Sequence, residues 1–139
     1  MSDAGEERAR IAEILKESVS VAIVGLSPKE SRPSNIVGAY LLEQGFRIYP
    51  VNPGQKQIFG LPCYPDLASL PGPVDIVDIF RKPDDVLRLV EQLVAMRWLP
   101  KMVWMQKGIV HQEAAALARR HGMFVVMDRC IKIDHEGLL

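Results

Sequence analysis

The stretch Val21-Ala22-Ile23-Val24-Gly25-Leu26-Ser27 decides the fold of this chain. Its first four residues are apolar and predict a buried strand, and Gly25 predicts a tight turn. Pro33-Ser34 then predicts the start of a helix, because proline suits a first helical turn. Where a parallel strand runs through a glycine turn into a helix, backbone N–H groups become available to a phosphate. The stretch therefore predicts a parallel α/β sheet with an anion-binding loop at its carboxyl edge.

Strands alternate with helices along the rest of the chain. This alternation predicts a three-layer, Rossmann-like α/β fold with a mostly parallel sheet in the order 3-2-1-4-5-6. The third strand is expected to be short and at an edge, since Pro62 cannot donate to a ladder. The length fits one domain, 1–139, with an N-terminal helix in 1–18 and a tail over 129–139. The predicted strands are 20–25, 47–51, 62–64, 75–80, 101–105 and 124–128, and the predicted helices are 4–18, 33–45, 84–96 and 112–121, with one helical turn from Asp66.

Composition limits the partners and the compartment. The 17 basic and 17 acidic residues leave no net positive field to attract nucleic acid. No apolar run approaches the ~20 residues of a membrane span, and the charged segment 1–10 lacks a signal-peptide core. Cys63 and Cys130 are too far apart for a C-x-x-C motif. We therefore expect a cytoplasmic protein with reduced thiols that binds neither nucleic acid nor membrane.

The loop between the first strand and the next helix holds the candidate phosphate ligands. Ser27 and Ser34 can donate hydroxyl hydrogen bonds, and Arg32 can pair with a phosphate through two N–H groups. Because Arg32 precedes Pro33, it is expected to be extended and to project from the loop. The loop lacks the G-x-G-x-x-G pattern of dinucleotide-binding domains. A purely structural interpretation stays open, in which Ser34 caps the helix and Arg32 is solvated.

Candidates for the other end of a nucleotide follow the second and fourth strands. Asn52-Pro53 stands where an NAD-binding domain carries an acid for the ribose, and its neutral amide and flat ring suit adenine instead. Phe80 can pack on a base, and Arg81, Lys82 or Lys56 can meet a second phosphate. A plain turn and a loop with solvated charges are the structural alternatives.

The fifth and last strands contribute further candidates. Trp104 and Gln106 share one face of the fifth strand, so Trp104 is expected in the core while Gln106 and Gly108 lie at the strand end. Cys130 follows the last strand and is expected to be a small, buried or partly exposed thiol. The three histidines are scattered, and no Ser-His-Asp or Cys-His set follows from their spacing.

Together these segments resemble those of the small stand-alone CoA-binding protein family, whose members are similar to the CoA-binding domain of the succinyl-CoA synthetase α-subunit. The resemblance covers residues 10–135 and implies a Rossmann-like fold that binds coenzyme A. It is carried, in order, by Val24-Gly25-Leu26-Ser27-Pro28, Arg32-Pro33, Pro50-Val51-Asn52-Pro53, Asp75-Ile76-Val77-Asp78-Ile79-Phe80-Arg81, Val103-Trp104-Met105-Gln106-Lys107-Gly108 and Met127-Asp128-Arg129-Cys130.

The same resemblance implies an arrangement of the ligand along the sheet edge. The phosphates would lie over Gly25, Ser27 and Arg32, and the pantetheine arm would run toward Gln106, Gly108 and Cys130. The adenosine would lie near Val51-Asn52-Pro53 and Phe80-Arg81. No catalytic or metal-binding residue is expected. The complete set of expected cofactor-binding residues is Gly25, Ser27, Pro28, Arg32, Pro33, Ser34, Val51, Asn52, Pro53, Lys56, Phe80, Arg81, Gln106, Gly108 and Cys130.

Two departures from the synthetase argue against ligase activity by this chain alone. There is no room for the synthetase's second domain, which bears a phosphorylated histidine, and its Thr-Glu-Gly segment appears as Gln106-Lys107-Gly108, without the acid. Cations at two separate positions suit the pyrophosphate and the 3′-phosphate of coenzyme A, whereas NAD has only the pyrophosphate. We therefore expect a protein that binds coenzyme A or an acyl-CoA without catalysis by itself.

Three alternatives stay open. The first is an NAD(P)-dependent oxidoreductase, against which the missing acid after the second strand argues. The second is a component of an acyl-CoA ligase that needs a protein partner, for which the apolar segment 133–139 is a candidate surface. The third is thiol regulation, in which Cys130 forms a mixed disulfide with coenzyme A.

Overall fold

The computed structural model describes residues 3–139, so residues 1–2 of the expected domain and N-terminal helix lie outside the described residues. Strands and helices alternate as the sequence predicts. In chain order the elements are α1 (Asp3–Glu17), β1 (Ser20–Val24), α2 (Pro33–Glu43), β2 (Arg47–Val51), β3 (Gln57–Ile58), β4 (Leu61–Pro62), the short 3-10 helix η1 (Leu67–Ser69), β5 (Ile76–Ile79), α3 (Pro83–Val94), β6 (Met102–Met105), α4 (Gln112–Arg120), β7 (Phe124–Val126) and α5 (Ile131–Glu136).

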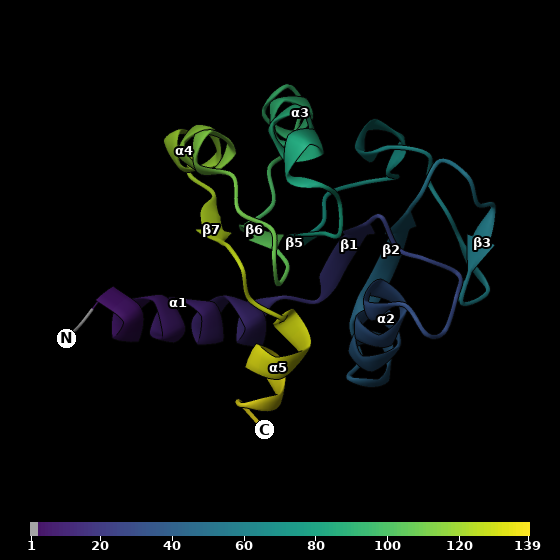
Figure 1. Cartoon of the computed structure of the whole chain (residues 1–139), viewed down its shortest axis with the longest axis horizontal. Helices are drawn as coiled ribbons and strands as arrows, with labels where there is room; N and C mark the ends of the chain where they lie inside the picture. The colour runs from purple at the N-terminus through teal and green to yellow at the C-terminus, as the bar shows by residue number, and fades with distance from the viewer. Residues whose placement is uncertain (1–2) are drawn as a thin grey trace.

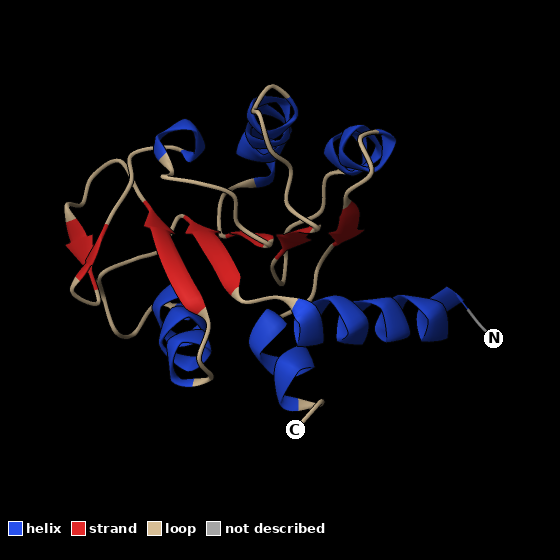
Figure 2. Ribbon diagram, turned by 180° about the vertical axis from the view of Figure 1, so that it is seen from behind, coloured by secondary structure: helices blue, strands red, loops and turns tan. Residues whose placement is uncertain are grey.

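Five strands form one parallel sheet in the order β2-β1-β5-β6-β7, which confirms the predicted Rossmann-like order for these strands. Helices α3 and α4 cover one face of this sheet, and α1, α2 and α5 cover the other (Figures 1 and 2). The winding therefore reverses between β1 and β5. In open α/β sheets, ligands bind outside the carboxyl ends of the strands at such a reversal.

The predicted third strand of this sheet is reduced to a single parallel bridge between Val51 and Tyr64. The chain before Tyr64 instead forms a separate antiparallel hairpin from β3 and β4. Both residues of its two-residue loop, Phe59 and Gly60, have positive φ angles of 58° and 73°, as a type I′ turn requires. Pro62 has no N–H to offer a longer ladder, which explains why the strand does not extend.

Apolar side chains fill both faces of the sheet. Strands β1, β5 and β6 are buried along their whole length, as expected for parallel strands covered on both sides. Trp104 is fully buried, which confirms its predicted place in the core, and its indole N–H donates to the carbonyl oxygen of Arg129 at 2.7 Å. Asp78 of β5 is also fully buried, although it carries a carboxyl group.

The expected C-terminal tail contains the helix α5. Its N-cap residue, Cys130, makes no side-chain capping hydrogen bond, so the sequence carries no helix-start signal there. Contacts with distant parts of the chain hold α5 instead. Ile131 is fully buried and its N–H donates to Oε1 of Gln106 at 3.2 Å. Arg129 makes two hydrogen bonds, of 2.6 and 2.8 Å, to Asp134.

Other boundaries differ only slightly from the prediction. Strand β7 ends at Val126 rather than at Asp128, because Asp128 has a positive φ of 58° that no strand can continue through. Helix α3 begins one residue earlier than predicted, at Pro83, the position that proline prefers. Within residues 3–139, no helix combines the length and the apolar composition needed to span a bilayer.

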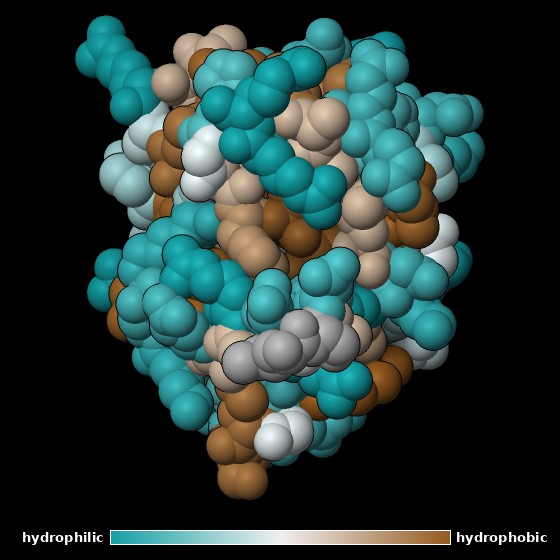
Figure 3. Space-filling view, turned by 90° about the vertical axis from the view of Figure 1, so that its left-hand side faces the viewer, coloured by the Kyte–Doolittle hydropathy of each residue, from teal (hydrophilic) through white to brown (hydrophobic). Residues whose placement is uncertain are grey.

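Apolar side chains are exposed near the C-terminus. Ile133 and Leu139 are 66% and 82% exposed. Figure 3 shows hydrophobic surface at the lower end of the molecule, the end at which α5 and the C-terminus lie in Figure 1. Isolated exposed apolar residues are common on soluble domains, so this surface does not by itself identify a partner.

Candidate functional site

Gly25 is the point at which the loops after β1, β2 and β5 meet. Its N–H donates to the carbonyl oxygen of Val51 at the end of β2, at 2.9 Å. Its φ is +87°, and a Cβ atom built on it would lie 2.3 Å from the carbonyl oxygen of Phe80. Only glycine tolerates both this backbone conformation and this close approach. The predicted glycine turn thus brings three strand ends into backbone contact.

A first cavity, of about 320 Å³, lies over the loop between β1 and α2, and we call it the loop cavity. Hydrogen bonds tie this loop to the first turn of α2: the N–H of Ser27 donates to Oγ of Ser34 at 2.9 Å, and the N–H of Lys29 donates to Oγ of Ser27 at 3.1 Å. The start of a helix favours an anion through its free N–H groups and its dipole. The lining residues are Gly25, Ser27, Lys29, Arg32, Pro33, Ser34 and Phe80.

The positions of Arg32 and Ser34 at the start of α2 bear on two interpretations of this loop, as a phosphate-binding loop or as a purely structural one. Arg32 is the N-cap residue, is exposed, and has the extended conformation that the following proline predicts (φ −78°, ψ 143°). Within the described chain its guanidinium group forms no ion pair. The idea that Ser34 caps the helix is wrong, because Ser34 is the second helical residue and its buried hydroxyl accepts from Ser27.

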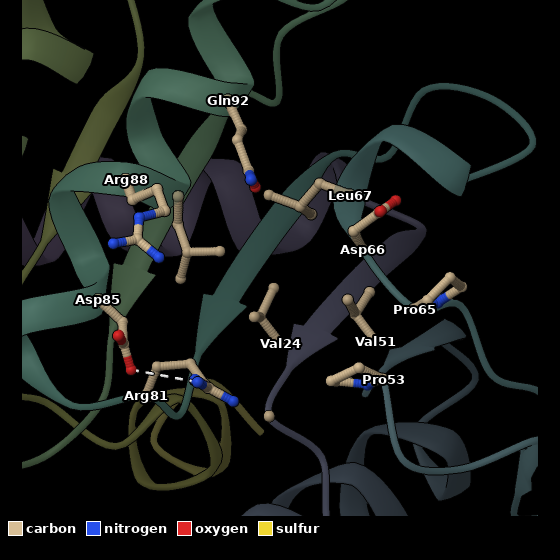
Figure 4. Close-up of a pocket in the computed structure, with 12 residues that line it drawn as sticks. Val24, Val51, Pro53, Pro65, Asp66, Leu67, Arg81, Asp85, Arg88 and Gln92 are labelled. Atoms are coloured by element: carbon tan, nitrogen blue, oxygen red, sulfur yellow. Dashed lines mark hydrogen bonds and ion pairs between the residues drawn. The ribbon is translucent and has the colours of Figure 1, made fainter.

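A second cavity, of about 170 Å³, lies between η1 and α3, and we call it the η1–α3 cavity. Figure 4 shows the side chains of Val24, Val51 and Leu67 converging on it from below and from one side. Arg81 stands at one end, held by an ion pair of 3.2 Å to Asp85. Gly25, which lines the loop cavity, also lines the η1–α3 cavity, so the two cavities meet at this residue.

Asn52 lies between the two loops and is occupied by hydrogen bonds within the protein. Its Nδ2 donates to the carbonyl oxygen of Leu26 at 2.9 Å, and its Oδ1 accepts from the N–H of Gly54 at 2.8 Å. The Cys63 thiol donates to the Asn52 carbonyl oxygen at 3.5 Å. Burial raises the pKa of this thiol. Asn52 therefore fixes the loop after β1 against the loop after β2.

The remaining predicted residues lie away from these two cavities. Gln106 is buried and holds the start of α5, and the N–H of Gly108 donates to Oδ1 of Asp128 at 2.7 Å. Cys130 is half-buried at the N-cap of α5. Lys56 is exposed on the loop after β2. Pro28 lines a third, larger cavity of about 760 Å³ that runs over α2 toward the β3–β4 hairpin.

The structure therefore brings together most, but not all, of the predicted site residues. Those that line the loop cavity or the η1–α3 cavity are Gly25, Ser27, Arg32, Pro33, Ser34, Val51, Pro53, Phe80 and Arg81. Those that line neither are Pro28, Asn52, Lys56, Gln106, Gly108 and Cys130.

Sequence reasoning missed one whole wall of the η1–α3 cavity. Helix α3 supplies Asp85, Arg88, Leu89 and Gln92 to this wall. Their spacing of three, one and three residues places them on one helix face. That spacing is present in the sequence, but charged and amide residues on a helix usually face solvent. This face of α3 forms a cavity wall only because η1 lies opposite it. Lys29 in the loop cavity was also missed.

Asp78 is the one buried group whose hydrogen-bonding capacity is unmet among the described residues. Both carboxyl oxygens lack a partner, and desolvation raises the pKa of Asp78 well above its usual value. In the sheet it pairs with Ile23 of β1 and Trp104 of β6. It lines neither cavity. Burial therefore disfavours the ionised form of this acid, which lies two residues before Phe80, the residue whose carbonyl oxygen approaches Gly25.

These features define a Rossmann-like α/β domain with two adjoining cavities at the carboxyl edge of its sheet. The chain belongs to the CoA binding domain family, whose model matches residues 19–136. It is 34% identical over 128 residues to the uncharacterized protein YneT of Bacillus subtilis, a match that covers 92% of this chain and 93% of that protein. A hypothetical protein from Pyrococcus horikoshii OT3 has a similar structure, with a TM-score of 0.88, 39% identity, and 94% and 91% of the two chains covered.

A second group of relatives consists of much longer proteins. Acetate–CoA ligase [ADP-forming] I of Archaeoglobus fulgidus is 28% identical over 119 residues, which are 80% of this chain but 17% of the ligase. The dinucleotide forming acetyl-coenzyme A synthetase 1 of Ca. Korarchaeum cryptofilum, solved with phosphate and ADP, matches with a TM-score of 0.71 and 26% identity. That match covers 81% of this chain and 26% of the synthetase chain. The chain is thus similar to one region of these enzymes.

Proposed function

We propose that this protein binds coenzyme A, free or acylated, at the carboxyl edge of its sheet and performs no catalysis by itself. The observation that carries the proposal is that the loop cavity and the η1–α3 cavity meet at Gly25. One cavity is cationic and lies at a helix start, and the other has an apolar floor. A ligand that fits both has a phosphate group joined to a ring system, as the ADP part of coenzyme A does. Membership of the CoA binding domain family supports this ligand over other nucleotides.

The pyrophosphate is assigned to the loop cavity. Lys29 and Arg32 supply cations there, and the start of α2 supplies backbone N–H groups. Arg32 is well suited to this role because it is extended, exposed and without an ion-pair partner in the described chain. A guanidinium group can donate two parallel hydrogen bonds to one phosphate, which a lysine cannot do.

The adenosine and its 3′-phosphate are assigned to the η1–α3 cavity. Its apolar floor suits a purine ring, and Arg81 and Arg88 line the cavity together with Asp85, the ion-pair partner of Arg81. A phosphomonoester carries close to two negative charges, so it suits a place that two guanidinium groups can reach. The exposed Lys56, on the loop after β2, is a further candidate cation for this phosphate.

The pantetheine arm is assigned to the part of the edge beyond Gly25, toward β6 and β7. Gly108 is exposed and Cys130 is half-buried there. Gln106 is 4% exposed, so its contribution is to hold the start of α5 beside the arm rather than to offer a large contact surface. This assignment leaves the thiol or thioester end near the surface, where a partner can reach it.

The histidines support a binding role rather than a catalytic one. His111 Nδ1 accepts from the N–H of Ala114 at 3.1 Å, His121 lies 3.1 Å from the carbonyl oxygen of Leu117, and His135 lies 2.7 Å from the Tyr40 hydroxyl. None of the three lines the loop cavity or the η1–α3 cavity. Each has a structural role at a helix end or between helices.

A thermal-shift comparison of coenzyme A, dephospho-CoA, NAD and NADP tests the proposal. A ligand at 100 times its dissociation constant stabilises the folded state by about 2.7 kcal/mol, which is roughly 10 °C for a domain of this size. We expect a large shift with coenzyme A and a smaller one with dephospho-CoA. A shift with NAD or NADP alone would instead favour an oxidoreductase, and no shift with any of the four would refute the proposal.

The Arg32→Ala variant tests the loop cavity, with Arg47→Ala as its control. Arg47 is also an exposed arginine, but it lies at the opposite, amino end of β2. Loss of a charge-assisted hydrogen bond costs roughly 1.5–3 kcal/mol, so Arg32→Ala should weaken coenzyme A binding by about 10- to 150-fold. Equal affinities for the two variants, measured by calorimetry, would remove Arg32 from the site.

A second candidate function is that of a CoA-binding component completed by another chain. The similarity to a region of acetate–CoA ligases favours it. The purified protein, given acetate, ATP and coenzyme A, should then form no ADP alone but should form it with the missing chain. ADP formation by the protein alone would contradict both this candidate and the binding-only proposal.

A further inference from the structure

The wall that α3 contributes to the η1–α3 cavity is polar at both ends and apolar between them. Arg81, on the loop before α3, lies at one end beside its ion-pair partner Asp85 (Figure 4), and Arg88, Leu89 and Gln92 follow along the helix. Figure 4 shows the amide of Gln92 pointing into the cavity above Leu67. A cavity with charged groups at one end and a neutral amide at the other distinguishes the two ends of its ligand.

Gln92 is the polar group that faces the cavity at the end far from Arg81 (Figure 4), one helical turn beyond Arg88. Asp66, on the opposite side, turns its carboxylate away from the cavity (Figure 4) and accepts hydrogen bonds from the N–H and Oγ of Ser69, at 2.9 and 2.6 Å. Gln92 is an exposed residue, and within residues 3–139 no protein group forms a hydrogen bond with its side-chain amide. The amide is therefore free to bind a ligand.

We propose that Gln92 recognises the adenine base of the bound nucleotide and selects a 6-aminopurine. A carboxamide presents a donor and an acceptor side by side, and the adenine edge formed by the 6-amino group and N7 presents the matching acceptor and donor. A 6-oxopurine offers two acceptors at the same edge and cannot make both bonds. This inference rests on the proposed binding of coenzyme A and assigns the residue that specifies its base.

The surroundings of Gln92 suit this role. The floor formed by Val24, Val51 and Leu67 is buried, so a base lying on it loses water from one face. The amide carries no charge, so it adds no repulsion toward the phosphates of the ligand. An acid at this position would accept from the 6-amino group but would repel those phosphates.

The experiment compares two ligands that differ only at the base, coenzyme A and 1,N6-etheno-CoA, in which the 6-amino group is blocked. Binding of both is measured by calorimetry to the wild type, to Gln92→Ala and to the control Glu91→Ala. Glu91 is the preceding exposed residue of α3 and does not line the cavity. Alanine preserves helix propensity at both positions, and thermal unfolding without ligand checks that the variants fold.

We expect wild type and Glu91→Ala to prefer coenzyme A over the etheno analogue. Gln92→Ala should bind coenzyme A about 5- to 150-fold more weakly, the range for a paired contact between an amide and adenine, and should lose most of the preference. An unchanged preference in Gln92→Ala would overturn this inference while leaving coenzyme A binding intact. No binding of coenzyme A by the wild type would overturn the proposed function and this inference with it.

Discussion

Replacing Asp78 with asparagine should remove a pH dependence of stability that the wild-type fold carries. Asp78 is fully buried and both of its carboxyl oxygens lack hydrogen-bond partners in the described chain. Desolvation raises the pKa of Asp78 well above its usual value of 3.8. In the folded protein the acid therefore stays protonated at pH values at which it has already ionised in the unfolded chain.

The sign of the effect follows from proton counting. Between the unfolded and the folded pKa, the folded state binds one proton more than the unfolded state, so the free energy of unfolding falls as the pH rises. The slope for one group is about 1.4 kcal/mol per pH unit in that interval. Below the unfolded pKa both states are protonated, and the group adds no pH dependence. The pH-dependent part of the cost of burying Asp78 is therefore absent in acid and grows as the pH rises above the unfolded pKa.

The measurement is urea unfolding of the wild type and Asp78→Asn from pH 4 to pH 7. Asparagine has nearly the same shape but cannot ionise, so any constant penalty from its unpaired amide shifts all points equally and leaves the slope intact. Above pH 4 the stability advantage of Asp78→Asn should grow with pH, by at most about 1.4 kcal/mol for each pH unit, for as long as the folded state keeps the proton that the unfolded state has lost. Glu91→Gln, which removes an exposed acid on α3, is the control. A difference between wild type and Asp78→Asn that does not change with pH would refute the reasoning.

Two further substitutions test the backbone and the C-terminal helix. Gly25→Ala should destabilise the fold more than Gly45→Ala. Both glycines have positive φ, which makes Gly45→Ala cost about 1–2 kcal/mol, but only a Cβ on Gly25 meets another atom, the Phe80 carbonyl oxygen at 2.3 Å. Equal losses of stability in urea unfolding would contradict this prediction. Gln106→Leu removes the acceptor for the N–H of Ile131. It should therefore lower the free energy of unfolding by about 1–3 kcal/mol and speed hydrogen exchange in α5. Unchanged exchange would show that other contacts hold this helix.

The parallel sheet could be predicted because its strands are buried on both faces. Runs such as Val21–Val24 and Met102–Met105 have to be apolar throughout, and the turns between them carry proline or glycine where the backbone demands it. The same rule predicts that Asp78 is buried, because it lies within such a run. Burial of an acid without a partner could not be predicted, because it depends on which side chains of other strands lie beside it.

The elements that were missed depend on contacts between distant parts of the chain. Helix α5 has six residues and no side-chain cap, so an isolated chain of that sequence would not be helical. Its start is fixed by Gln106, which lies 25 residues earlier. The β3–β4 hairpin turns at Phe59, whose positive φ is unusual for an aromatic residue. Its ring contacts Gly38 of α2, where a Cβ atom would lie 2.9 Å from it.

The loop cavity and the η1–α3 cavity also differ in how far the sequence predicts them. The loop cavity is built largely by backbone. It requires a positive φ at Gly25 and an extended residue before Pro33. Each requirement restricts the residue type, so the sequence predicts both. The α3 wall is built by side chains on a helix surface, where many residue types are compatible with the fold, and Arg88 and Gln92 become a wall only because η1 packs opposite them. It follows that substitutions at Gly25 should damage folding and binding together, whereas substitutions at Gln92 should change the ligand preference and leave the fold intact.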